Sequence, residues 1–264
     1  MDLGIRGKTA LVAAASDGLG KAVALRLAQE GANVVICARN PERLESAIRE
    51  IESANAEVRV TGFTTDLASA GDIARLGKLL ESNRLGIDIL VNNAGGPPPG
   101  FFDDIEDRQW QEAFELTMMS AVRLTRLVLA HMRARKWGRI INITSYSVKQ
   151  PMAQMVLSNS IRMGVVGWAK TLSNEVASQG ITVNNVCPGW TRTARVDQLL
   201  QARAQASGME PEALEQSLIA AIPCRRIGEV TEFADVVAFL ASGNASYVTG
   251  TTLPIDGGAV SAAM

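Results

Sequence analysis

A glycine-containing turn near the start of the chain is the first feature that could do chemistry. In chain order it contains Ala14, Ala15, Ser16, Asp17, Gly18, Leu19 and Gly20. Glycine has no side chain, so it lets the backbone come close to a pyrophosphate. A helix that begins there adds free N–H groups and the positive end of its dipole. The turn follows an expected strand and opens an expected helix, which is the context that a dinucleotide-binding turn requires.

The elements that would position this turn alternate between short apolar runs and amphipathic stretches. Strands are expected at residues 9–14, 34–38, 58–64, 87–91, 139–144, 181–186 and 252–255. Helices are expected at residues 21–30, from 41 onward, and at 70–84, 107–131 and 231–241, and another long helix is expected within 152–179. Continuously apolar strands are typical of parallel sheets buried on both faces, and their alternation with helices implies right-handed crossovers. The sequence predicts an α/β fold of Rossmann type, with a doubly wound, mainly parallel sheet of seven strands in a three-layer αβα arrangement.

Two segments interrupt this regular pattern, at residues 95–100 and 190–223. Both follow strands at the carboxyl edge of the sheet, where open α/β sheets bind ligands. The second segment is rich in Gln, Ala and Leu. It predicts a helical lid over a substrate, with ordinary packing helices as the alternative. No linker or repeat divides the chain, so residues 1–264 are expected to form a single domain.

Composition excludes several classes of protein. The chain has 264 residues, 47% of them hydrophobic, a formal net charge of −1 and a single histidine, His131. A multi-histidine metal site is therefore impossible. The net charge near zero gives no indication of a basic surface that would bind nucleic acid or a membrane. Cys37, Cys187 and Cys224 are widely spaced, which favours buried thiols in a reducing compartment. We expect a cytoplasmic protein that acts on a small molecule.

Several ordered motifs resemble those of the short-chain dehydrogenase/reductase family. Besides residues 13–20 they are Asp66-Leu67, Asn92-Asn93-Ala94-Gly95, Pro188-Gly189 with Thr193, Arg226-Ile227-Gly228 and Asp256-Gly257-Gly258. The likeness is strongest to the branch of β-ketoacyl-acyl-carrier-protein reductases, within a subgroup whose glycine and catalytic motifs are imperfect. The resemblance implies that these motifs bind a nicotinamide dinucleotide. It assigns Asp66 and Leu67 to the adenine side, and Pro188, Gly189 and Thr193 to the nicotinamide side.

One position of the turn departs from the family, which has glycine where this chain has Ala14. Alanine disfavours positive φ, so we expect the turn to differ slightly there. Gly18 and Gly20 are expected to keep the close approach to the pyrophosphate.

The choice between the two nicotinamide cofactors depends on the end of the second strand. The resemblance places the family's acidic, NAD-selecting position at Ala38, and Arg39 follows it. A guanidinium there can pair with a 2′-phosphate, which favours NADP(H) over NAD(H). Asp17 argues for NAD(H), because its charge would lie near that phosphate unless it pairs with Arg39.

The catalytic positions that the resemblance implies are only partly filled. The family uses a Ser to polarise a carbonyl, a Tyr to give the proton, a Lys four residues later, and an upstream Asn. Here Ser145 is present, while the Tyr, Lys and Asn positions hold Ser158, Arg162 and Thr117. A serine is a much weaker acid than a phenol, and Arg cannot release a proton as Lys can.

Arg162 could still supply charge beside a developing alkoxide, bind an acidic substrate, or hold the nicotinamide ribose. An alternative is a relocated pair made by Tyr146 and Lys149, three residues apart on the loop after Ser145.

The function expected from this resemblance is an NADP(H)-dependent oxidoreductase that reduces a carbonyl, possibly a 3-oxoacyl group, or oxidises the matching alcohol. The alternative is a dinucleotide-binding sensor or structural protein with little activity. A homotetramer or homodimer is expected, because family members commonly assemble through two long helices. The candidate contact residues are Leu124, Leu127, Val128, Val165, Val166 and Trp168, with core burial as the alternative.

Overall fold

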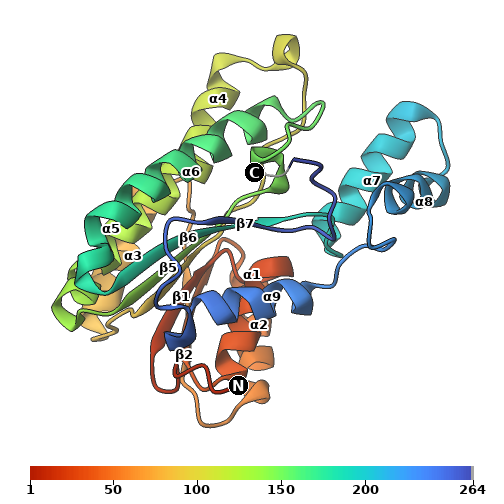
Figure 1. Ribbon diagram of the computed structural model, residues 1–264. Helices are drawn as coiled ribbons and strands as arrows, with labels where there is room; N and C mark the ends of the chain where they lie inside the picture. The colour runs from red at the N-terminus through yellow and green to blue at the C-terminus, as the bar shows by residue number, and fades with distance from the viewer. Residues whose placement is uncertain (263–264) are drawn as a thin grey trace.

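The computed structural model describes residues 1–262, except for the side chains of residues 202, 203, 206 and 207. In this part of the chain seven strands form one sheet in the order β3-β2-β1-β4-β5-β6-β7 (Figure 1). They are β1 (Thr9–Ala13), β2 (Asn33–Ala38), β3 (Val60–Thr64), β4 (Ile89–Asn92), β5 (Gly138–Ile143), β6 (Ile181–Pro188) and β7 (Thr252–Ile255). All the pairings between them are parallel. The predicted doubly wound fold of Rossmann type is confirmed, and the sheet is wholly rather than mainly parallel.

Helices cover both faces of the sheet. They are α1 (Gly18–Gln29), α2 (Pro41–Ala54), α3 (Ala70–Ser82), α4 (Asp107–Ala113), α5 (Ser120–Arg135), α6 (Val156–Val176), α7 (Ala194–Ser207), α8 (Pro211–Ala221) and α9 (Val230–Leu240). Apolar residues of α1, α2 and α9 pack on one face, around Val12 and Ile36. Those of α3, α5 and α6 pack on the other, around Leu11 and Val35. Adjacent strand residues thus serve opposite cores, which explains why the central strands β1, β2 and β4 are largely apolar.

Two predicted elements differ from the structure for identifiable reasons. The helix expected at 107–131 is divided by a π-helical segment, Phe114–Met119, before it continues to Arg135. The long helix expected within 152–179 is confirmed as α6, and it begins only after Gln154, which has a φ of +60°. The third strand begins two residues late, because the Val58 amide donates to the Asn55 carbonyl in a turn, at 3.3 Å.

The candidate interface residues and the cysteines differ in how deeply they are buried. Leu124, Val128 and Val165 are at most 3% exposed within one protomer, so they are core residues. Leu127, Val166 and Trp168 are only half-buried. Cys37 and Cys187 are buried as expected, whereas Cys224 is exposed.

The segment expected to form a lid is helical. Residues 190–223 contain α7 and α8, which lie beside the body of the molecule, away from the sheet (Figure 1). Arg192 and Glu215 join the start of α7 to α8, with 2.6 Å between guanidinium and carboxylate. No helix of residues 1–262 combines the length and apolar character that a bilayer crossing needs.

The direction of winding locates the candidate site. The chain leaves β1 into α1 on one face of the sheet, and it leaves β4 toward α5 on the other. Loops at the carboxyl ends of these adjacent strands therefore diverge and open a crevice, the usual ligand site of such sheets.

Candidate active site

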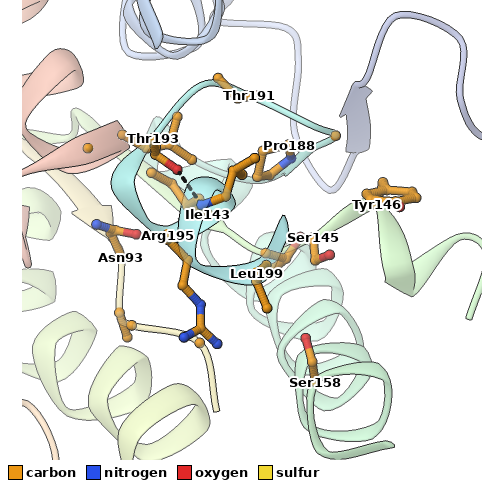
Figure 2. A pocket seen from close by; sticks show the side chains of 18 of the residues that line it. Asn93, Ile143, Ser145, Tyr146, Ser158, Pro188, Thr191, Thr193, Arg195 and Leu199 are labelled. Atoms are coloured by element: carbon orange, nitrogen blue, oxygen red, sulfur yellow. Dashed lines mark hydrogen bonds between the residues drawn. The ribbon is translucent and has the colours of Figure 1, made fainter. Parts of the chain in front are cut away.

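The crevice holds a cavity of about 350 Å³ (Figure 2). The predicted site residues that line it are Ala14, Asp17, Gly18, Leu19, Asn93, Ala94, Gly95, Ser145, Ser158, Arg162, Pro188, Gly189 and Thr193. The others lie outside this lining and are Ser16, Gly20, Arg39, Asp66, Leu67 and Thr117. The structure thus brings the glycine turn, the end of β5, α6 and the start of the lid to one space.

The turn after β1 keeps its left-handed geometry despite its alanine. Ala14 has a φ of +47° and Gly18 a φ of +55°. The expectation that Ala14 would change the turn is wrong, since the alanine itself adopts the conformation that glycine prefers. The Ala15 amide donates to the Cys37 carbonyl at 3.2 Å, which ties the turn to β2 and holds Ala14 in place. An L-residue in this conformation stores about 1–2 kcal/mol of strain.

We expect Ala14→Gly to raise the free energy of unfolding by about 0.5–1 kcal/mol. The relieved strain exceeds the extra backbone entropy of glycine, about 0.5–1 kcal/mol. Urea denaturation measures the change. Ala130→Gly, at an exposed position inside α5, is the matched control and should lose about 0.5–1 kcal/mol. A loss of stability in both variants would contradict strain at Ala14.

The glycine turn is held against the loop after β4 by a hydrogen bond from Asn93 and by close packing at Gly20. The Asn93 side-chain amide donates to the Ala14 carbonyl at 3.2 Å. A Cβ on Gly20 would lie 2.6 Å from that carbonyl oxygen and 2.7 Å from Asn93 Nδ2. Only glycine fits there, so the start of α1 approaches the sheet edge closely. In the first turn of α1 the Gly18 amide donates to the Asp17 carboxylate and the Lys21 amide to the Asp17 carbonyl, whereas the Leu19 and Gly20 amides have no intrahelical partner.

The residues assigned to the adenine side lie at the ends of β2 and β3. Arg39 follows β2, is exposed, and has no ion-pair partner in the described chain. The Thr65 amide donates to the Ala38 carbonyl at 2.9 Å, so Asp66 lies on the same edge as Arg39. Leu67 is 4% exposed and packs in the core. The Asp17 carboxylate accepts from the Gly18 amide at 2.7 Å and caps α1, so the suggested pairing with Arg39 is not formed.

The segment after β6 closes the cavity from the lid side. The Gly189 amide donates to the Ile255 carbonyl at 2.9 Å, which fixes the end of β6 against β7. Thr193 caps α7, and its hydroxyl accepts from the Val196 amide at 3.3 Å (Figure 2). The Thr193 methyl carbon lies 3.6 Å from where a Cβ on Gly18 would stand. The segment of residues 190–223, predicted to be a lid, therefore begins against the glycine turn.

Three of the four positions assigned to catalysis converge on the cavity. Ser145 lies just after β5, and the Ser158 side chain points from α6 toward the cavity (Figure 2). Arg162 lies one helical turn further along α6. Thr117 is buried in the π-helical segment and does not line the cavity, and its hydroxyl has no hydrogen-bond partner in the described chain.

Ser145 is oriented by its own loop. Its hydroxyl oxygen accepts a hydrogen bond from the Ser147 amide at 3.1 Å. This contact uses a lone pair of the oxygen and leaves the hydroxyl proton free to donate elsewhere. The side chain can therefore present a donor to a substrate oxygen.

Arg162 is a buried cation without a carboxylate. It is 8% exposed, and its Nη1 donates to the Ile143 carbonyl at 3.1 Å and to the Thr144 carbonyl at 2.9 Å. Burial, and to a smaller extent the positive charge of Arg195, lowers the pKa of its guanidinium to about 10. The group still carries its charge at neutral pH.

The alternative pair is only partly in place. Tyr146 begins a short 3₁₀ turn, Tyr146–Val148, and lines the cavity (Figure 2). Lys149 does not line the cavity.

Sequence reasoning missed Arg195. Its side chain extends from the first turn of α7 toward the loop after β4, and its Nη2 donates to the Pro97 carbonyl at 3.2 Å (Figure 2). A basic residue two positions after the capping Thr193 is the only signal in the sequence. It also missed the apolar wall of the cavity, formed by Met152, Met155, Trp190, Val196 and Leu199.

Comparison with known proteins identifies the fold family. A family model described as enoyl-(acyl carrier protein) reductase matches residues 13–260. A nodulation protein G of Rhizobium sp. (strain N33) is 36% identical over 96% of this chain and 97% of its own length. A 3-oxoacyl-[acyl-carrier-protein] reductase of Pseudomonas aeruginosa is 35% identical over 97% and 98% of the two chains. The chain belongs to the short-chain dehydrogenase/reductase family.

This dehydrogenase/reductase is also similar in structure to solved relatives. The crystal structure of L-sorbose reductase from Gluconobacter frateurii, complexed with NADPH and L-sorbose, superimposes with a TM-score of 0.94 at 33% identity. The match covers 99% of this chain and 100% of the other. The chain is thus an oxidoreductase of this family.

Proposed function

We propose that this short-chain dehydrogenase/reductase uses NADPH to reduce the carbonyl of a small molecule, and that it oxidises the matching alcohol in reverse. The observation that carries the proposal is the convergence of Ser145, Ser158 and Arg162 on a cavity that the glycine turn also lines. The L-sorbose reductase with NADPH and the 3-oxoacyl reductase among its relatives support a ketone substrate, including a 3-oxoacyl group.

The residues of the crevice fit a dinucleotide. The close approach that Gly20 permits and the free first-turn amides of α1 suit a pyrophosphate. We assign the turn from Ala14 to Gly20 to this group, with Ser16, Asp17, Gly18 and Leu19 between them. Asn93, Ala94, Gly95, Pro188, Gly189 and Thr193 are assigned to the nicotinamide side, and Asp66 and Leu67 to the adenine. Bound NADPH would supply the hydride that the carbonyl carbon receives.

The side chains of the chain itself would handle the charge on the substrate oxygen. The Ser145 hydroxyl donates a hydrogen bond to the carbonyl oxygen. The Arg162 cation stabilises the negative charge that develops there, because a buried charge acts strongly in a site of low dielectric constant. Since arginine does not release a proton at working pH, Ser158 or a water molecule delivers it. Without a phenol as acid, we expect a rate about 10²–10⁴ lower than that of a complete tetrad.

Purified protein with NADPH and a panel of ketones and aldehydes tests this function, with nicotinamide absorbance as the readout. Consumption of NADPH that depends on the carbonyl compound supports the reductase. The Ser and Arg at the Tyr and Lys positions favour one second candidate, a dinucleotide-binding sensor or structural protein. Tight NADPH binding without turnover on any compound would support that candidate instead.

Arg39→Ala tests the choice of NADPH over NADH. A guanidinium–phosphate contact contributes about 1.5–3 kcal/mol, so we expect the Kd for NADPH to rise about 10- to 100-fold. The Kd for NADH should change less than about threefold, because it has no 2′-phosphate. Isothermal titration calorimetry measures both, and Arg59→Ala, an exposed arginine before β3, is the matched control. Equal losses for the two cofactors would contradict a role for Arg39 in selecting the phosphate.

We further propose the cytoplasm as the compartment and a homotetramer or homodimer as the assembly. The free cysteines suit a reducing compartment. The half-buried Leu127, Val166 and Trp168 on α5 and α6 support an interface on these helices. Light scattering of the purified chain measures the assembly.

A further inference from the structure

Two arginines from different parts of the fold meet in the cavity. Arg162 reaches it from α6 and Arg195 from the first turn of α7. Both approach Gly96, on the loop after β4. A Cβ on Gly96 would lie 3.7 Å from Nη2 of Arg195 and 3.9 Å from Nη2 of Arg162. The two guanidinium groups therefore border one small space.

Neither guanidinium is neutralised by the described chain. Arg162 donates only to the carbonyls of Ile143 and Thr144, and Arg195 donates to the carbonyl of Pro97. Among the described residues that line the cavity, Asp17 is the only acidic one, and it caps α1 at the glycine turn. By contrast, the neighbouring Arg192 pairs with Glu215 on the outside of the lid.

Arg162 is the buried member of this pair, whereas Arg195 is exposed. Burying the Arg162 cation without a counter-charge costs free energy, and the nearby Arg195 cation adds repulsion. The lowered pKa of Arg162 reflects both effects. Arginine forks are well suited to planar oxyanions, and an anion between them would satisfy the remaining N–H groups of both.

We infer that the substrate of this site carries a carboxylate, which binds between Arg162 and Arg195 beside Gly96. A carboxylate fits because its two oxygens can each accept from one arginine. The apolar part of the cavity wall, with Met152, Met155 and Leu199, suits an apolar chain or ring beyond the reacting carbonyl. The carbonyl then stays close to the carboxylate, and the Arg162 charge can act on both groups. The substrate class is thus an oxo acid with an apolar chain or ring. This inference rests on the proposed function for the reacting carbonyl, but not for the anion site itself.

The contact would also couple binding to the lid. Arg195 belongs to the first turn of α7, whereas Arg162 belongs to the body of the fold. A carboxylate held by both would tie the lid to α6 and to the loop that carries Gly96. Substrates that lack the negative charge would lose this tie as well as the ionic contact.

Matched pairs of substrates test the inference. The probes are 2-, 3- and 4-oxo acids with apolar chains, each compared with its methyl ester in an NADPH consumption assay. We expect kcat/KM for at least one acid to exceed that of its ester at least tenfold. Arg195→Gln should reduce this preference about tenfold or more, mainly through KM, and Arg195→Lys should restore part of it. Arg59→Gln removes the same charge outside the cavity and should leave the preference unchanged.

A binding measurement separates this inference from the proposed function. Calorimetry with the same oxo acids, with and without NADPH, reports the anion site even if no compound is turned over. Binding of acids but not esters, lost in Arg195→Gln, supports the site whether or not reduction occurs. Equal binding of acids and esters, or no effect of Arg195→Gln on acid binding and on the kinetic preference, would overturn it. Failure of NADPH to bind would refute the proposed function alone.

Discussion

Ser145→Ala is expected to lower kcat/KM for carbonyl reduction about 10²- to 10³-fold, with the Kd for NADPH unchanged. The expected size is that of removing one preorganised donor from an oxyanion site. The Ser147 amide donates to the Ser145 oxygen at 3.1 Å, so the oxygen is held in place while its proton stays available to the substrate. Steady-state kinetics measure the loss, and calorimetry checks that cofactor binding persists.

Ser147→Ala is the matched control for this variant. Ser147 lies two residues after Ser145 and is buried. Its hydroxyl has no hydrogen-bond partner in the described chain, and the residue does not line the cavity. Its loss should leave kcat/KM within about threefold of the wild type. Full activity in Ser145→Ala would refute its role. If Tyr146→Phe then lost the activity, the proton would come from the relocated pair with Lys149.

The fold was predictable from sequence because the pattern is local and repeated. Each strand of the sheet reads as an apolar run, and each following helix presents one apolar stripe, so the order of elements alone requires parallel crossovers. The π-helical segment at Phe114–Met119 was not predictable. The residues around it keep a helical pattern, and the break depends on how the segment packs against α6.

The cavity was predictable only where motifs define it. The glycine turn and Ser145 lie at strand ends, so the strand register alone brings them together. Arg195 enters from the lid, and its position depends on how residues 190–223 fold back over the loop at Pro97. No periodicity encodes that contact. The conformation of Ala14 was mispredicted because propensity describes the average alanine, whereas hydrogen bonds of Ala15 and Asn93 determine this one.

The substitution of Arg for the expected Lys also changes how activity should depend on pH. The pKa of Arg162 is lowered, mainly by burial, only to about 10, so nearly all of this arginine is charged from pH 6 to pH 8. Its ionisation therefore adds no step to the pH dependence of activity over that range. The chemistry that it supports is charge stabilisation rather than proton transfer, which agrees with its hydrogen bonds to the carbonyls of Ile143 and Thr144. Those bonds fix the guanidinium beside the end of β5, next to Ser145.

Gly20→Ala is expected to raise the Kd for NADPH at least 100-fold. The added methyl group would lie 2.6 Å from the Ala14 carbonyl oxygen, 2.7 Å from Asn93 Nδ2 and 3.0 Å from the Ala15 Cα. Two of these atoms belong to the backbone, and the Ala15 amide is bonded to Cys37 in the adjacent strand. The turn cannot move aside without leaving the sheet edge. The start of α1 must therefore shift, and the amides proposed to hold the pyrophosphate shift with it.

Calorimetry with NADPH measures this effect, and circular dichroism shows whether the variant stays folded. Gly71→Ala in α3 is the matched control, because its new Cβ would make only an ordinary contact, 3.7 Å from the Ser69 hydroxyl oxygen. If Gly20→Ala does not fold, Asn93→Ala replaces it, since that change removes the hydrogen bond to Ala14 without adding atoms. We expect it to weaken NADPH binding about tenfold, the equivalent of one net hydrogen bond. A folded Gly20→Ala that binds NADPH as the wild type does would place the cofactor elsewhere in the crevice, because no dinucleotide resting on this turn could tolerate the displacement.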